Sequence, residues 1–197
     1  MNPLLPAESQ RNLILASRSP RRKEILDRMR LDFEVVPAGD HVENGGDSSD
    51  DPFERAELHA RLKAADVAER YPDAVVIGAD TVVTIDGDVL EKPADDAEAV
   101  RFLKKLSGRT HIVATGVAVR RGATGLDLSA RETTRVRFRE LDDEEIAKYV
   151  ASGEGRDKAG AYAVQGIGAG LVQSIDGCFF NVVGLPVALL FDLLRKV

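Results

Sequence analysis

The chain has 197 residues, of which 44% are hydrophobic and 30% are charged, a composition typical of a soluble globular protein. Its formal net charge of −6 argues against nucleic acid as a partner, and its one cysteine excludes an intrachain disulfide. The sequence begins without the basic and apolar regions of a signal peptide, and no apolar segment is long enough to cross a bilayer. We therefore expect a cytoplasmic protein without membrane contact.

Apolar runs with strand and helix periodicity alternate along the chain, which indicates an α/β fold. In chain order we expect a strand at 11–16, a helix at 20–30, a strand at 33–36, a helix at 53–70, strands at 74–85 and 89–90, a helix at 95–106, strands at 111–119 and 133–138, a helix at 142–152, strands at 171–175 and 178–181, and a helix at 185–197. Asp86-Gly87 and Asp176-Gly177 are typical turn pairs, so each is expected to close a hairpin. The polar segment 39–52 is expected to be a loop.

The junction after the first strand combines two serines with a cluster of cations. Ser17 and Ser19 end the strand, and Arg21, Arg22 and Lys23 lie in the first turn of the expected helix. Cations there oppose the helix dipole, so without an anion these arginines should add nothing to stability. Unpaired backbone N–H groups beside cations suit a phosphate chain. The alternative is an ordinary N-cap at Ser19 followed by solvated arginines.

An acidic residue, Asp80, interrupts the otherwise apolar strand at 74–85. A buried carboxylate is costly unless it is paired, bonded to a cation or functional, so a functional role is predicted. The alternative is an aspartate on a bulge that hydrogen-bonds to the backbone. The next residue, Thr81, either positions a substrate or fills a strand position.

A segment rich in small residues, 157–166, contains Lys158 and Gln165. Small residues let the backbone approach a ligand closely, and an amide offers both a donor and an acceptor to a base edge or a water. The alternative is a glycine-rich turn between a helix and a strand. Lys63 and Lys92 are further candidate cations, although most lysines are simply solvated.

Several motifs occur together in the order typical of the Maf family, which the sequence resembles from about residue 12 to its end. The resemblance is carried by Ser17-x-Ser19-Pro20-Arg21-Arg22-Lys23-Glu24-Ile25-Leu26, Gly78-Ala79-Asp80-Thr81-Val82, Leu90-Glu91-Lys92-Pro93, Leu106-Ser107-Gly108, Asp157-Lys158-Ala159-Gly160-Ala161-Tyr162 and Val183-Gly184-Leu185-Pro186. It implies a nucleoside triphosphate pyrophosphatase that cuts the α–β phosphoanhydride to give a monophosphate and pyrophosphate. It also implies one domain over 1–197, with a short irregular extension at 1–10. The implied fold is an elongated mixed sheet flanked by helices, with two lobes around a cleft, as in inosine triphosphatases.

The resemblance extends to the branch of the family that acts on dTTP and UTP, with CTP and modified pyrimidine nucleotides as further candidates. The branch that acts on 7-methyl-GTP carries Trp after Ser-Pro and Gln after the catalytic Asp, where this chain has Arg21 and Thr81. Arg22, Thr81 and Gln165 match the positions that set specificity in the pyrimidine branch. A purine-type or 7-methyl-GTP pyrophosphatase and a nucleotide-sensing regulator of cell division without turnover stay open as alternatives.

Roles for individual residues follow from the same resemblance. Asp80 is the implied base that takes a proton from the water attacking the α-phosphorus. A divalent cation, Mg²⁺ or Mn²⁺, is the implied cofactor, with Glu43 and Asp80 as candidate ligands. Glu43 matches the family's usual Asp-Glu pair only if one residue is inserted. A homodimer is left open. The residues implied to bind phosphate are Ser17, Ser19, Arg21, Arg22, Lys63, Lys92 and Lys158.

Overall fold

The computed structural model describes residues 2–43 and 49–197. The chain divides into two compact units, and three long strands contribute residues to both. Unit 1 comprises Met1–Asp80, Thr115–Glu132 and Gly184–Val197, and unit 2 comprises Thr81–Ala114 and Thr133–Val183. The three shared strands are β3 (Val75–Ile85), β5 (Thr110–Arg121) and β6 (Leu126–Phe138).

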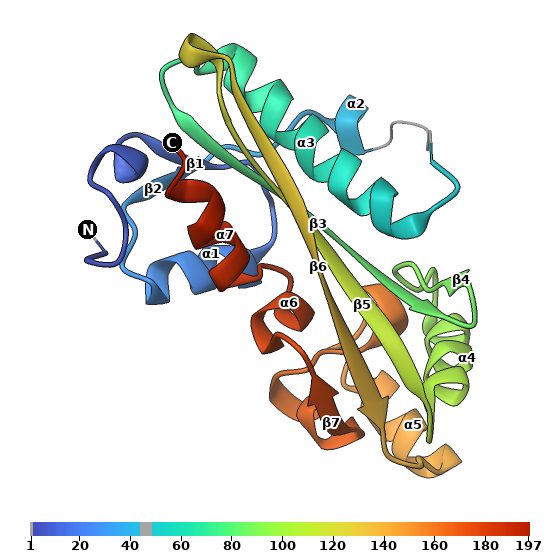
Figure 1. Ribbon diagram of the computed structural model, residues 1–197. Coiled ribbons are helices and arrows are strands. Elements are labelled where there is room, and N and C mark those ends of the chain that lie inside the picture. Colours follow the sequence, from blue (N-terminus) through green and yellow to red (C-terminus); the bar gives the residue numbers. More distant parts are fainter. Residues whose placement is uncertain (1, 44–48) are drawn as a thin grey trace. The chain divides into compact units, whose positions relative to one another are not determined.

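The described residues form one sheet of seven strands in the order β2-β1-β3-β5-β6-β7, with β4 paired to β3. The short strands are β1 (Leu13–Leu15), β2 (Phe33–Val35), β4 (Asp88–Val89) and β7 (Val172–Asp176). β1 pairs in parallel with both β2 and β3, whereas β4 is antiparallel to β3 and β7 is antiparallel to β6. Helices flank this mixed sheet, which confirms the predicted α/β class (Figure 1).

Unit 1 packs helices on both faces of its part of the sheet. The longest, α3 (Pro52–Arg70), lies on one face, and α1 (Pro20–Arg28) and α7 (Val187–Leu194) lie on the other (Figure 1). The face of α3 toward the sheet is made of small residues such as Ala60 and Ala64, which pack with strand residues including Ile14 and Val76. Gly78 extends this close approach, because a Cβ there would lie only 2.1 Å from the carbonyl oxygen of Ala60.

Unit 2 is built around α4, which packs against α5 and a short 3-10 helix, η3. Asp95 caps α4 by accepting a hydrogen bond from Glu98 N, and Asp142 forms a capping box with Glu145 at the start of α5, so both helices begin where the sequence predicts. The bounds in this unit are α4 (Asp96–Leu106), α5 (Asp143–Ala151), η3 (Ala159–Ala161), η4 (Gly166–Leu171) and α6 (Phe179–Val183).

The second predicted hairpin is wrong, because the chain after β7 enters α6 and forms no strand at 178–181. Side chains distant in sequence direct this turn. Thr134 Oγ1 accepts a hydrogen bond from Cys178 N at 3.0 Å, and Asn181 Nδ2 donates to the Val113 carbonyl at 2.9 Å. These bonds hold the backbone against β5 and β6 without adding a strand.

Two further expectations need correction in unit 1. The predicted loop at 39–52 contains a short helix, α2 (Asp40–Glu43), and residues 44–48 of that loop lie outside the described residues. The strand predicted at 133–138 begins earlier, at Leu126, and the added residues contact α3, where Ser129 Oγ donates to Glu57 at 2.6 Å. Two short 3-10 helices complete the fold, η1 (Glu8–Gln10) and η2 (Gly122–Thr124). No helix in the described part of the chain is long and apolar enough to span a membrane.

Candidate active site

The start of α1 is organised by the two serines that the sequence singles out. Ser19 is the N-cap, and its Oγ accepts a hydrogen bond from Arg22 N at 3.5 Å. Ser17 Oγ accepts hydrogen bonds from Ser19 N at 3.2 Å and from Arg22 Nη1 at 3.1 Å. The ordinary-cap interpretation of Ser19 is therefore correct. It leaves the first turn of α1 with the N–H groups that an anion could use.

Arg22 is buried, with 8% of its surface exposed, so the alternative of a solvated arginine is wrong for this residue. Its Nε donates to the Gly184 carbonyl at 2.8 Å, and its Nη1 donates to the Ala79 carbonyl at 2.8 Å. The guanidinium thus ties α1 to the backbone beside Asp80. Because these bonds form without a ligand, we now expect Arg22 to stabilise the ligand-free protein, contrary to the expectation from the helix dipole. Arg21, one residue earlier, is half-buried.

Asp80 is held by two side chains one turn apart on α3. Lys63 Nζ donates to Asp80 Oδ1 at 2.8 Å, and His59 Nδ1 lies 3.7 Å from Asp80 Oδ2. The Lys63 side chain is 6% exposed and the Asp80 side chain 21%. Lys63 reaches the strand because Gly78 and the alanines of α3 let the helix lie close to β3. The carboxylate is therefore paired with a cation, which offsets the cost of its burial, and its functional role stays a prediction.

The charges around Asp80 decide its protonation state. Burial alone would raise the pKa of Asp80, but hydrogen bonding to His59 and the positive charges of Lys63 and Arg22 outweigh it and lower the pKa to about 2. The carboxylate is ionised throughout the neutral range. It is also a weak base in the ligand-free protein, because its pKa lies far below the pH of a neutral solution.

His59 is the site residue that sequence reasoning missed. The three histidines lack metal-ligand spacing, and that test alone gives His59 no role. A different signal was present, since residues four apart on a helix share a face and His59 lies four residues before Lys63. Once Lys63 is taken as a site residue, His59 follows it onto the same side of α3.

In unit 2 the structure brings together the segments that contain Lys92 and Lys158. Gly160 N donates to the carbonyls of Leu90 and Glu91 at 3.0 and 3.1 Å, which fixes the second segment beside the first. Lys92 is exposed, and Lys158 is half-buried with its Nζ 2.6 Å from Asp157 Oδ1. Thr81 and Gln165, also in unit 2, are both half-buried.

The described side chains include no group of three His, Cys, Asp or Glu residues that could hold a metal ion. Glu43 is the last residue of α2, and its side chain lies outside what the structure describes. Asp80 thus offers a single carboxylate, with one oxygen already bonded to Lys63.

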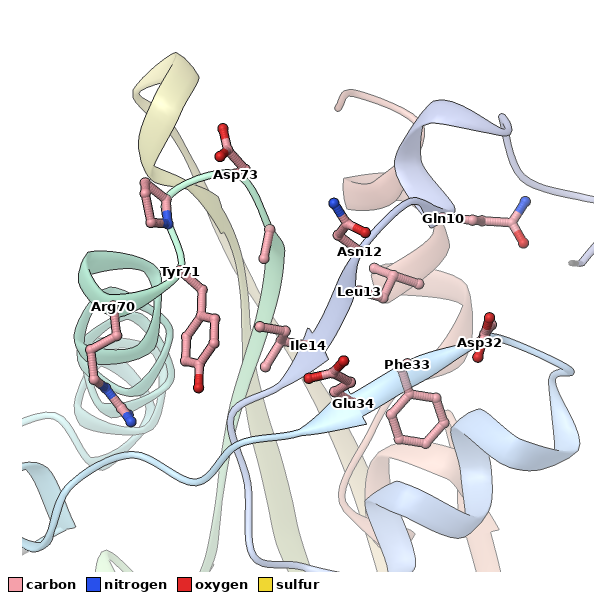
Figure 2. Close-up of a pocket in the computed structure, with 12 residues that line it drawn as sticks. Gln10, Asn12, Leu13, Ile14, Asp32, Phe33, Glu34, Arg70, Tyr71 and Asp73 are labelled. Atoms are coloured by element: carbon pink, nitrogen blue, oxygen red, sulfur yellow. The ribbon is translucent and has the colours of Figure 1, made fainter.

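A cavity of about 510 Å³ lies elsewhere in unit 1, at the amino ends of β1, β2 and β3 (Figure 2). Asn12, Glu34 and Tyr71 are among its lining residues, and none of the predicted site residues contributes to it. Asp80 lies beyond the segment of β3 that pairs with β1, toward the carboxyl ends of the parallel strands. Ligands of open α/β sheets usually bind at that end, so the cavity does not replace the predicted site.

Comparisons with known proteins agree with the motif order. Residues 12–197 match the family of Maf-like proteins. A dTTP/UTP pyrophosphatase of Ruminiclostridium cellulolyticum is 46% identical over 187 residues, covering 95% of this chain and 96% of the relative. One of Koribacter versatilis is 49% identical over 184 residues, covering 93% of each chain. A HAM1 protein from Coxiella burnetii aligns with a TM-score of 0.44 and 19% identity over 64% of this chain and 72% of that one, a likeness too small to carry an argument. With the family match spanning nearly its whole length, this chain belongs to the Maf family.

Proposed function

We propose that this protein is a nucleoside triphosphate pyrophosphatase that hydrolyses dTTP and UTP at the α–β phosphoanhydride. The products are the nucleoside monophosphate and pyrophosphate, and CTP and modified pyrimidine nucleotides are further candidate substrates. The curated relatives named above carry this activity in their names at 46% and 49% identity. The observation that carries the proposal is the ionised Asp80 carboxylate beside Lys63, His59 and the buried Arg22.

Phosphate binding is assigned to the groups that the sequence singles out. The N–H groups at the start of α1, with Ser17 and Ser19, supply neutral donors in unit 1. Charge comes from Arg21, Arg22 and Lys63 there, and from Lys92 and Lys158 in unit 2. Arg22 has a second role, because its bonds to the backbone orient the strand that carries Asp80.

Asp80 is proposed to accept the proton of the attacking water. The negative charge of a bound triphosphate would act to raise the pKa of Asp80 from about 2, because it shares the ammonium of Lys63. A divalent cation held by the same carboxylate would act to lower that pKa. General-base assistance contributes roughly 10²–10⁴-fold, so the positioning of the phosphates must supply much of the remaining acceleration.

A divalent cation, Mg²⁺ or Mn²⁺, is proposed as the cofactor. When bound, it would neutralise charge on the phosphate oxygens. Mg²⁺ usually keeps several waters and binds through one or two carboxylates plus substrate phosphates, so the single carboxylate of Asp80 fits an ion that arrives with the nucleotide. Glu43 is the second proposed ligand.

Base selection is assigned to Arg22, Thr81 and Gln165. Pyrophosphate release measured on dTTP, UTP, CTP, GTP, 7-methyl-GTP and ITP tests the assignment. We expect dTTP and UTP to be hydrolysed well above the purine nucleotides. Highest turnover on 7-methyl-GTP or ITP would overturn the pyrimidine assignment, and tight binding without pyrophosphate release would indicate a sensor of nucleotides. We further propose that the protein acts in the cytoplasm to clear unwanted nucleotides. A homodimer is a further proposal, and light scattering of the protein in solution tests it.

A further inference from the structure

The backbone on both sides of Gln165 is held by two side chains from earlier in unit 2. On the amino side, Ala163 N donates to Tyr149 Oη at 3.0 Å. On the carboxyl side, Glu154 accepts two hydrogen bonds, from Ile167 N to Oε1 at 3.0 Å and from Gly168 N to Oε2 at 2.8 Å. The chain from 163 to 168 is therefore fixed at both ends with Gln165 between them.

Tyr149 and Glu154 form a hydrogen-bonded pair. The Tyr149 phenol is hydrogen-bonded to the Glu154 carboxylate, and burial together with that carboxylate raises the pKa of Tyr149. The phenol stays protonated at any pH of interest, so it can donate to Glu154 while it accepts from Ala163 N. Bonds to an ionised acceptor are stronger than those between neutral groups.

Two glycines of this segment pack tightly against Glu154 and Tyr149. A Cβ at Gly166 would lie 2.1 Å from Glu154 Oε1, and one at Gly168 would lie 2.8 Å from Tyr149 Oη. Gly166 also has a φ of +65°, a conformation that favours glycine. At Gly168 a Cβ would also meet the Ala163 carbonyl oxygen, so no larger residue fits there, and at Gly166 a larger residue would displace the Glu154 carboxylate.

Gln165 itself is half-buried, with an extended backbone at φ −107° and ψ 171°. Its side-chain amide makes no hydrogen bond to any other residue of the described chain. No other described side chain orients this amide by a hydrogen bond, and the backbone fixes where the side chain begins and the direction of its Cα–Cβ bond. We infer that Glu154 and Tyr149 are positioning residues for Gln165, which hold its amide in the orientation that selects the nucleobase. This inference rests on the proposed function, in which Gln165 contributes to base selection.

The test compares kcat and KM on dTTP and GTP for Glu154→Ala, Tyr149→Phe and Gln165→Ala. Losing one well-oriented contact to the base should raise the KM for dTTP about tenfold with a smaller change in kcat. The preference for dTTP over GTP should fall by a similar factor in all three variants. In the double variant of Glu154→Ala with Gln165→Ala, selectivity should fall no further than in Gln165→Ala alone, because both changes remove the same interaction.

Glu144→Ala is the matched control, since it removes an exposed acid of α5 that pairs only with Lys148 among the residues described. It should leave selectivity unchanged. Thermal unfolding of each ligand-free variant separates a loss of folding from a loss of selectivity. If Glu154→Ala does not fold, Glu154→Gln and Tyr149→Phe carry the test, since each keeps most of the packing.

The outcomes separate this inference from the function on which it rests. If Gln165→Ala lowers selectivity but Glu154→Ala lowers kcat/KM equally on dTTP and GTP, Glu154 is merely structural and the inference is wrong. Additive losses in the double variant would overturn it as well. If Gln165→Ala leaves selectivity intact, or the wild-type protein does not hydrolyse dTTP, the proposed function itself fails.

Discussion

Acidification from pH 7 to pH 4 should destabilise the fold through one side chain, His111. The ring is 1% exposed and packs edge-on against Phe138 and Tyr162, and its Nε2 lies 2.7 Å from Tyr162 Oη. Burial lowers the pKa of His111 from 6.5 to about 4. Protonation would place a donor on both ring nitrogens, and Nδ1 has no partner among the described residues.

The sign and size of the effect follow from proton binding. In the unfolded chain His111 takes up a proton near pH 6.5, whereas in the folded protein it does so only near pH 4. Between these values the unfolded state holds more protons, so the free energy of unfolding falls as the pH falls. A difference of about 2.5 pH units corresponds to ~3 kcal/mol. This contribution is fully present above pH 6.5 and is lost by about pH 4.

His111→Phe isolates the contribution of His111 to the pH dependence of stability, because phenylalanine keeps the aromatic packing and cannot titrate. Urea unfolding followed by far-UV circular dichroism between pH 4 and pH 7 gives the free energy of unfolding of both proteins. At pH 7 the variant should be less stable by ~1–2 kcal/mol, since Tyr162 loses its hydrogen-bond partner. At pH 4 the order should reverse. A stability difference that does not change with pH would refute the reasoning, and the NMR titration of the ring provides a direct check.

Three other substitutions probe the site. Asp80→Asn should lower kcat on dTTP by at least ~10²-fold while nucleotide binding persists, and near-normal turnover would rule Asp80 out as the base. Arg22→Ala removes three hydrogen bonds from a buried guanidinium, so thermal and urea unfolding should show a loss of ~2–3 kcal/mol in the ligand-free protein as well as reduced kcat/KM. An unchanged melting temperature would contradict the structural role. Gly78→Ala should push α3 away from β3, which we expect to destabilise the fold by ~1–3 kcal/mol and to weaken the Lys63–Asp80 pair. Wild-type stability in urea unfolding would contradict this, because it would mean that α3 shifts without cost.

Local signals predict those elements whose hydrogen bonds close within a short stretch of chain. Ser19, Asp95 and Asp142 each cap a helix through a backbone N–H three residues away, so their placement is readable from sequence. The turn at Asp176-Gly177 carries an equally clear hairpin signal, yet α6 follows it. Thr134 decides that outcome from more than forty residues away, and no local pattern contains its contribution.

The same distinction separates the predicted from the unpredicted parts of the site. Asp80 is conspicuous because it is an acid within an apolar strand, and the cations are conspicuous at the start of α1. Sequence alone does not show that Arg22 bonds to the backbone of Ala79 and Gly184, since those partners are 57 and 162 residues away. A buried arginine and a solvated one look identical until the tertiary fold is known.

The low proton affinity of Asp80 links binding to catalysis in the proposed mechanism. In the ligand-free protein Lys63, His59 and Arg22 keep the carboxylate ionised, with a pKa of about 2, so protonation does not limit activity near neutral pH. The same cations make it a poor base. The negative charge of a bound triphosphate would act to raise this pKa, whereas a divalent cation on the same carboxylate would act to lower it. Lys63→Met, which removes both a positive charge and a 2.8 Å hydrogen bond from the carboxylate, should therefore raise the pKa of Asp80 and weaken phosphate binding together. The pH profile of kcat/KM and the KM for dTTP check both effects, and an unchanged acid limb would contradict this account.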